Sequence, residues 1–178
     1  MEILSKLFYH LGSYGPTILI FISLILLWNK SNLFNYYLIG VFLNVIINIV
    51  LKGIIQQARP SDDPKLLKIA LKDGSRTIFK HGVPFNIFGM PSGHAESSFY
   101  TTVFIWFSLK NNYIFSAYLL FSLLIISQRV YLEYHTVFQV FVGAIVGSTF
   151  AYLIYYLSQK KIVGKLLPRK EDNGPKDN

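Results

Sequence analysis

Residues 34–55 read FNYYLIGVFLNVIINIVLKGII, an apolar run whose one formally charged side chain is Lys52, near its end. A membrane-spanning α-helix rises about 1.5 Å per residue and needs about 20 mostly apolar residues. This stretch therefore predicts a transmembrane helix. The whole chain has 178 residues, which is enough for one domain of ordinary size. We therefore expect a single architecture built around this helix.

Four further apolar stretches flank residues 34–55, at 14–28, 94–109, 113–127 and 136–157. Together they predict an all-α fold, a polytopic membrane bundle of about five transmembrane helices. The first stretch is short unless the weakly amphipathic segment 1–11 either extends it or lies at the membrane interface. No small-residue cleavage site follows it, so we expect this segment to be retained in the protein.

The composition excludes several classes of protein. It is 52% hydrophobic and 15% charged, against a usual charged share of about 25%, which argues against a disordered, coiled-coil or nucleic-acid-binding protein. The formal net charge of +8 indicates contact with phosphate head groups or with a phosphorylated substrate. Because the chain has no cysteine, disulfides, thiolate nucleophiles and thiolate metal sites are excluded.

Two polar segments interrupt the apolar pattern. We assign residues 1–158 to a membrane-embedded domain in which the loop 56–93 carries part of a site. Residues 159–178 form a basic tail whose Gly, Pro, Asp and Asn-rich end predicts partial disorder. With five spans, the loop and the tail lie on opposite sides of the membrane. When the three cations assigned below to the site are set aside, the Lys and Arg count favours a cytosolic tail and a site that faces a lumen or the exterior.

The first candidate cluster lies at the end of the 34–55 stretch. Lys52 and Arg59 are seven residues apart, which places both on one helix face, and Pro60 ends the helix. Asn44 and Asn48 continue this face inward. The cations could bind a phosphate or extend to lipid head groups, and the asparagines could line the site or make interhelical hydrogen bonds.

The second cluster, residues 89–94, reads GMPSGH and directly precedes the 94–109 stretch. A helix N-terminus offers unpaired N–H groups to an anion, and Gly93 lets the anion approach the backbone. Ser92 could cap the helix or donate to a phosphate oxygen. His94 is suited to proton transfer near neutral pH. The alternative is an ordinary turn with an interfacial histidine.

The third cluster, residues 127–139, reads SQRVYLEYHTVFQ and joins the last two apolar stretches. Arg129 offers a planar fork of donors that matches a phosphate. If a helix starts near His135, Gln139 lies one turn along on the same face. The Gln139 side-chain oxygen could accept the Nδ1 proton of His135, leaving Nε2 free to attack phosphorus. A carboxylate at this position would also stabilise positive charge on the imidazole.

Lys-x6-Arg-Pro, Pro-Ser-Gly-His and Arg-x5-His, in this order and each at a helix end, resemble the type 2 phosphatidic acid phosphatase superfamily of membrane lipid phosphatases. The resemblance implies a helical core of that type and no metal or other cofactor. It implies that His135 is the nucleophile that forms a phosphohistidine and that His94 is the general acid. It also implies that five residues form the phosphate cradle: Lys52, Arg59, Ser92, Gly93 and Arg129.

Two positions depart from the superfamily pattern. Gln128 stands where a serine is usual, and Ser127 is one residue too early to replace it. Gln139 stands where most members have aspartate. However, residues 129–140 resemble the dolichyl diphosphate phosphatase branch, which has Tyr-His-Thr and Gln-Val at the matching places. The resemblance therefore predicts hydrolysis of a polyprenyl diphosphate to its monophosphate.

Two alternatives stay open. The chain could be a broad phosphatase of phosphatidate and similar lipids, or a catalytically weakened scaffold that binds lipid phosphates. A channel or transporter would need polar residues through the centre of several helices, and only residues 34–55 show them. On each remaining interpretation the partners are a phosphorylated lipid and membrane lipids. The membrane could be the endoplasmic reticulum or a host membrane.

Overall fold

A computed structural model describes residues 2–60 and 88–160 of the chain. These residues form five helices and no strand: α1 (Glu2–Leu27), α2 (Ser31–Ile55), α5 (Gly93–Leu109), α6 (Asn112–Tyr131) and α7 (Val137–Gln159). The predicted all-α class is confirmed for this part of the chain. Most of the predicted polar loop and nearly all of the basic tail fall at 61–87 and 161–178, outside the described residues.

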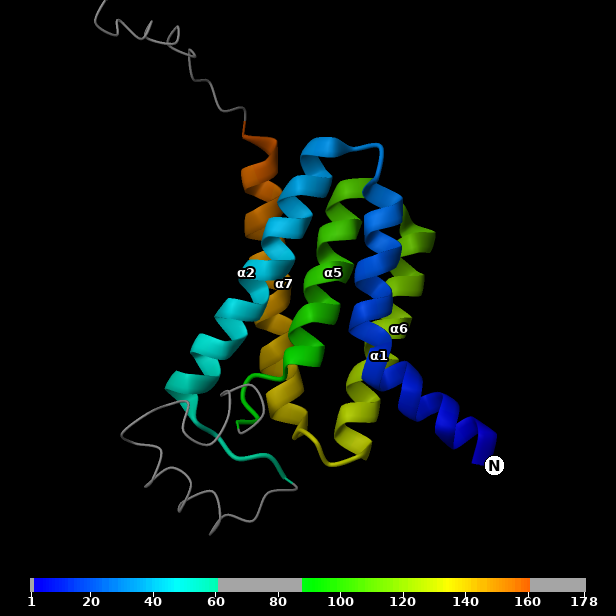
Figure 1. The fold of residues 1–178 in the computed structure, drawn as a ribbon, viewed down its shortest axis with the longest axis vertical. Helices are drawn as coiled ribbons and strands as arrows, with labels where there is room; N and C mark the ends of the chain where they lie inside the picture. The colour runs from blue at the N-terminus through cyan, green and yellow to red at the C-terminus, as the bar shows by residue number, and fades with distance from the viewer. Residues whose placement is uncertain (1, 61–87, 161–178) are drawn as a thin grey trace, which may run out of the picture.

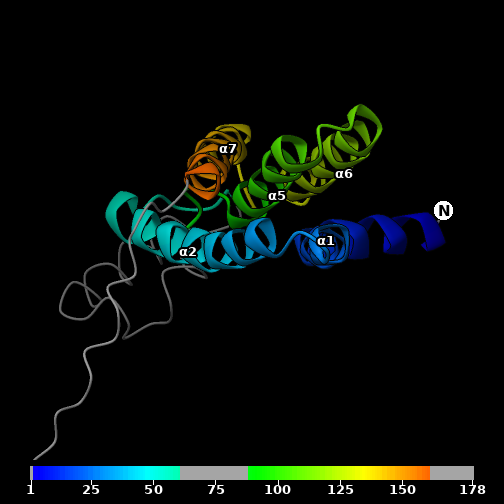
Figure 2. The same cartoon turned by 90° about the horizontal axis from the view of Figure 1, so that it is seen from above.

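The central helix of the bundle is α5. Seen from above, α1 and α2 form one layer, and α7, α5 and α6 form a second, with α5 between its two neighbours (Figure 2). Helix α5 packs against each of the other four helices. About half of its residues are buried, including polar ones at its N-terminal end. The position of α5 therefore decides where the Pro-Ser-Gly-His motif lies.

Four helices, α1, α2, α6 and α7, are long and apolar enough to cross a membrane. Helix α5 has 17 residues, which corresponds to roughly 26 Å, slightly less than a hydrocarbon core of about 30 Å. Its enclosed position explains why it can be shorter and more polar than the others. The predicted bundle of about five membrane helices is therefore confirmed, with α5 as its inner member.

Helix α1 is longer than the predicted stretch 14–28, because it begins at Glu2. The amphipathic start therefore continues the helix, and its place relative to the membrane interface stays a prediction. The N-terminal part of α1 bends away from the bundle (Figure 1). Pro16 lies inside the helix and has no N–H for the carbonyl of Gly12, which is the usual cause of such a bend.

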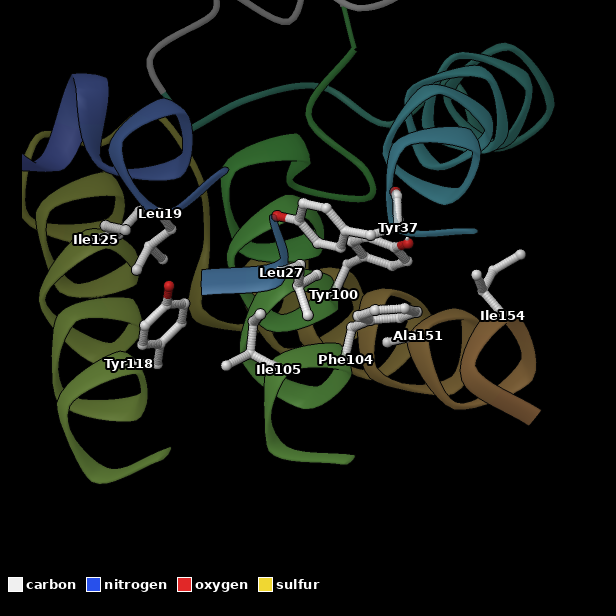
Figure 3. Close-up of a cluster of buried hydrophobic side chains, with 10 residues drawn as sticks. All are labelled: Leu19, Leu27, Tyr37, Tyr100, Phe104, Ile105, Tyr118, Ile125, Ala151 and Ile154. Carbon is white, nitrogen blue, oxygen red and sulfur yellow. Dashed lines mark hydrogen bonds between the residues drawn. The ribbon is translucent and has the colours of Figure 1, made fainter. Parts of the chain in front are cut away.

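A cluster of aromatic rings fills the middle of the bundle. Tyr37 of α2 stacks on Tyr100 of α5, with ring centroids 5.8 Å apart, and Phe104 packs against both rings (Figure 3). The hydroxyl of Tyr100 donates to the Tyr37 carbonyl at 3.2 Å, and that of Tyr37 lies 3.1 Å from the Thr101 hydroxyl. The rings are thus buried without leaving their polar ends unsatisfied.

Helix α7 lies directly against the first turns of α5. A Cβ atom added at Gly143 would overlap the carbonyl oxygen of Ser92, and one added at Gly147 would overlap that of Glu96. Small residues let two helix backbones approach closely. This contact brings the start of α7 beside the start of α5, where the second and third motifs meet.

Candidate active site

All three motifs lie at one end of the bundle, where α2 and α6 end and α5 and α7 begin (Figure 1). Lys52, Arg59 and Arg129 each lie close enough to act electrostatically on both His94 and His135. The structure therefore brings the candidate cations and the two candidate histidines into one site, with the following members: Lys52, Arg59, Ser92, Gly93, His94, Arg129, His135 and Gln139.

The polar face of α2 holds the segment that precedes α5. Lys52 is 1% exposed, and its ammonium group donates to the carbonyl of Phe88 at 2.5 Å. One turn earlier, the Asn48 amide donates to the carbonyl of Pro91 at 3.4 Å. The same amide donates to the Glu96 carboxyl of α5, so interhelical bonding, one of the two interpretations of the asparagines, applies to Asn48. These bonds fix both ends of residues 88–91, which lead into the helix.

The chain after α2 adds a further link to that segment. The prediction that Lys52 and Arg59 share one helix face, with Pro60 ending the helix, is wrong, because Gln56 has a φ of 50° and turns the backbone out of α2 directly after Ile55. The carbonyl of Gln57 then accepts from the N–H of Gly89 at 2.7 Å. Arg59 follows two residues later and is half-buried. The first motif is thus folded against the second by this backbone bond and by the Lys52 side chain, which places Arg59 beside the start of α5.

Ser92 is the N-cap residue of α5, and its side chain makes no capping bond. Its hydroxyl is buried and has no hydrogen-bond partner among the described residues. Its backbone N–H donates to the carbonyl of Gln139 at 3.1 Å. Of the two roles expected for this hydroxyl, capping is therefore excluded. Gly93 is the first helical residue, so the first N–H groups of α5, which have no partner within the helix, lie at the end of the bundle where the motifs meet.

His94 is oriented by α1. Its Nε2 atom lies 3.1 Å from the carbonyl oxygen of Ser13. A carbonyl only accepts, so Nε2 carries the proton and Nδ1 keeps the lone pair. No spacing in the sequence relates residues 13 and 94, and the contact depends on where the bent α1 crosses α5. Ser13 is therefore a member of the site that the sequence analysis missed.

Arg129 lies in the last turn of α6 and is 8% exposed. Its guanidinium lies over the ring of Tyr134, 4.2 Å from the centroid. Its carbonyl accepts from the N–H groups of both Tyr134 and His135, at 3.0 and 3.2 Å. Glu133, with a φ of 55°, makes the tight turn between them. The backbone of the turn therefore positions His135 directly from Arg129.

Gln139 orients the His135 ring. Its Oε1 atom lies 3.3 Å from His135 Nδ1 and also accepts from the N–H of Thr136 at 3.2 Å. The Thr136 hydroxyl in turn accepts from the N–H of Gln139, which completes a capping box at the start of α7. On its other side, Gln139 Nε2 donates to the carbonyl of Ala58 at 2.7 Å and to the Gln57 side chain at 3.1 Å.

The surroundings keep His135 neutral. Burial is the largest cause, and the positive charges of Arg59, Lys52 and Arg129 add to it, so that the pKa of His135 falls from 6.5 to about 3. The hydrogen bond to Gln139 offsets a smaller part of this shift. With Nδ1–H donated to Gln139, the Nε2 atom retains its lone pair at neutral pH. The arrangement can therefore present a neutral nitrogen nucleophile beside three cations.

The family model of the PAP2 superfamily matches residues 33–162, which include all three motifs. The chain belongs to the PAP2 superfamily. The matched residues include α5, α6 and α7 and all of α2 except its first two residues. The apolar lengths of the helices and this membership establish an integral, multi-pass membrane protein.

Three similar proteins are named dolichyldiphosphatase 1. The one from Mus musculus is 30% identical over 149 residues, covering 75% of this chain. Those from Plecturocebus moloch and Rhinolophus ferrumequinum are 28% and 27% identical over 175 residues, covering 88% of it. The chain spans 56% of the length of the mouse protein and 66% of the length of the other two. No solved structure matches the chain.

Gln128, the first departure from the superfamily pattern, serves the packing of α1 against α6. Its side chain is fully buried, and Nε2 donates to the carbonyl of Tyr9 at 3.2 Å and to the hydroxyl of Ser13 at 3.4 Å. Ser127 is exposed on another face of α6 and does not replace the usual serine. A glutamine here therefore joins the helix that carries Arg129 to the helix that orients His94.

The described residues hold no group of three or more His, Cys, Asp or Glu side chains that could bind a metal ion. The carboxyl group of Glu96 attracts Lys52 and is fully buried in the first turn of α5. Glu96 was not among the candidate residues predicted from the sequence. The only signal for it was an acidic residue inside an otherwise apolar stretch, which membrane helices rarely carry without a function.

Proposed function

We propose that the protein is a membrane lipid phosphatase that hydrolyses a polyprenyl diphosphate to the monophosphate and inorganic phosphate. The observation that carries the proposal is the pair of His135 and Gln139, in which a buried, neutral imidazole is oriented with Nε2 free. The names of the three similar proteins, which are dolichyldiphosphatases, support a polyprenyl diphosphate as the substrate.

In the first step, Nε2 of His135 attacks the terminal phosphorus, and the bond from phosphorus to the bridging oxygen breaks. Lys52, Arg59 and Arg129 neutralise the charge on the phosphoryl oxygens, which is the main source of catalysis in phosphoryl transfer. Ser92 and the amide of Gly93 complete the cradle. In the second step, water attacks the phosphorus, the P–N bond breaks, and inorganic phosphate leaves.

His94 supplies the proton to the leaving oxygen in this proposal. Because its Nε2–H is donated to Ser13, the lone pair of Nδ1 is the position that takes up a proton before that proton passes to the leaving oxygen. Water then returns a proton to His94 in the second step, so that the cycle balances. The catalytic domain in this proposal is residues 1–158, and neither a metal ion nor another cofactor takes part.

The test is phosphate release by the detergent-purified protein, in the presence of EDTA, from four substrates compared at equal concentration. These are a polyprenyl diphosphate, the polyprenyl monophosphate, phosphatidate and glucose 6-phosphate. The proposal predicts chelator-resistant release that is fastest from the diphosphate. A preference for phosphatidate would favour the broad lipid phosphatase, and no release from any of the four by folded protein would favour the scaffold.

A further inference from the structure

Glu96 is a buried acid in a site that also holds three cations, Lys52, Arg59 and Arg129, and the proposed mechanism gives it no role. It lies one turn after Ser92 on α5, and its side chain is 0% exposed. Its Oε2 atom accepts from the Asn48 amide at 2.5 Å, and Oε1 has no hydrogen-bond partner among the described residues. A carboxyl group in such surroundings is costly unless a charge or hydrogen bonds compensate it.

Lys52 supplies that compensating charge. It lies one turn beyond Asn48 on the same face of α2, and it attracts the Glu96 carboxyl across the α2–α5 contact. Lys52 is itself nearly inaccessible to solvent, and Arg59 and Arg129 repel it. Glu96 therefore provides an attractive interaction that offsets part of the repulsion of the other two cations.

Asn48, Lys52 and Glu96 also act together on the segment that precedes α5. Asn48 contacts both Glu96 and the carbonyl of Pro91, and Lys52 contacts the carbonyl of Phe88. Residues 88–91 lead directly to the amides that begin α5. The position of the Lys52 ammonium group and the path of this segment therefore depend on the same buried contacts.

We infer that Glu96 is a positioning residue, which acts through Lys52 and Asn48 to hold the Lys52 ammonium group and the 88–91 segment in the arrangement that receives a substrate phosphate. The inference rests on the proposed function, because it assigns Lys52 to the phosphate. It adds a residue that touches no reacting atom and still determines how well the cradle works.

The test is a double-mutant cycle in which kcat/KM is measured with a polyprenyl diphosphate. Glu96→Gln keeps the length of the side chain and an oxygen for Asn48, removes the charge, and replaces the second oxygen by an NH2 group. It should lower kcat/KM at least about tenfold when Lys52 is present and cause no further loss in a Lys52→Met background. The inference is overturned by an unchanged kcat/KM in the single variant, or by the same loss in both backgrounds.

Thr102→Val is the matched control on the same helix. Thr102 is buried and bonds the Ser122 hydroxyl at 2.9 Å, more than one turn beyond Glu96. Its replacement should lower the thermal stability and leave kcat/KM at the wild-type value, since a merely structural loss on α5 does not reach the cradle. A loss of kcat/KM equal to that of Glu96→Gln would show that the effect of Glu96 is not specific and would overturn the inference.

Affinity for inorganic phosphate, measured by calorimetry on the same four proteins of the cycle, separates the inference from the proposed function. Wild-type protein that releases no phosphate would refute the function, whereas the binding cycle still reports the coupling of Glu96 and Lys52. Glu96→Gln should change the affinity at least about threefold when Lys52 is present and should not change it in the Lys52→Met background. An equal change in both backgrounds overturns the inference. If Glu96→Gln does not fold, Glu96→Asp, which withdraws the carboxylate from Lys52, takes its place with the same expected outcomes.

Discussion

Oε1 of Gln139 lies 3.3 Å from Nδ1 of His135, one helical turn away at the start of α7. The opposite end of the same amide donates to the carbonyl of Ala58, immediately before Arg59. An aspartate could accept from the imidazole, but it has no N–H to donate and is one methylene shorter. Gln139 therefore does two things, because it orients the histidine and joins the third motif to the first.

The effects of the acceptor and of the donor of the Gln139 amide can be tested separately by mutation. Gln139→Glu keeps the acceptor for His135 and removes the donor for Ala58 and Gln57. We expect the protein to lose about 1–3 kcal/mol of stability, because a buried carbonyl loses its partner. The added negative charge should raise the pKa of His135. Thermal unfolding and the pH profile of kcat/KM measure the two effects.

Gln139→Asp should remain active, since its carboxylate can still orient His135. It should be less stable than wild type, because it also lacks the N–H group that donates to the Ala58 carbonyl. Unaltered stability in both the Glu and the Asp variant would show that the bond to Ala58 contributes nothing to the fold. An inert but folded Gln139→Asp variant would show that the site is built differently.

Gly89 provides the space for Gln139. A Cβ atom at residue 89 would lie 2.7 Å from both Nε2 and Oε1 of that side chain. We expect Gly89→Ala to displace the amide and to lower kcat about tenfold or more, because the histidine loses its orientation. The shorter side chain of Gln139→Asp should remove the overlap, so the double variant should be more active than Gly89→Ala alone. Equal activity of the two would contradict this explanation.

The pH dependence follows from the lowered pKa of His135. Burial and the positive charges of Arg59, Lys52 and Arg129 lower it to about 3, so the nucleophile stays neutral well below pH 6.5. The loss of kcat/KM on acidification should therefore not reflect protonation of His135 near its usual pKa. Histidine NMR of the free protein measures this directly, and a His135 resonance that titrates near 6.5 would contradict the electrostatics described here.

The same shift has a consequence for stability. The folded state resists protonation of His135, whereas the unfolded chain takes up the proton near pH 6.5, so the unfolded state binds more protons between the two values. This contribution should make the protein progressively less stable as the pH falls from about 6.5 towards 3. His135→Gln, which carries no titrating group, should show a smaller loss over this interval in thermal unfolding.

The contact between α5 and α7 depends on Gly147. Gly147→Val would place side-chain atoms against the Glu96 carbonyl and should cost several kcal/mol, since the two backbones must separate. Gly53→Ala is the matched control, because a Cβ atom there meets nothing within 4 Å. Replacing a helical glycine in open space should be neutral or stabilising by up to about 1 kcal/mol. Equal thermal stability of the two variants would refute the close packing.

The sequence predicts the helices and the meeting of the motifs for simple physical reasons. Long apolar runs have few alternatives in a membrane, and motifs at helix ends on one side of a bundle must lie near each other. The hydrogen bond between His135 and Gln139 was predicted from helical spacing alone, and the structure has this geometry. Such local relations can be predicted from residue numbers alone.

Contacts between distant segments could not be predicted in the same way. The bonds of His94 to Ser13 and of Gln128 to Tyr9 depend on where a bent α1 crosses its neighbours. Likewise, no periodicity shows that Glu96 faces Asn48. The orientation in the membrane and the boundary between residues 158 and 159 stay predictions.

The most direct test of the central claim is to trap the phosphorylated enzyme. A polyprenyl diphosphate labelled in its terminal phosphate is mixed with the protein and quenched within one turnover, and the labelled residue is identified by mass spectrometry. The account predicts acid-labile, alkali-stable label on His135 and none in His135→Ala, which should bind inorganic phosphate but release none from substrate. Full turnover by folded His135→Ala, or label on another residue, would contradict it.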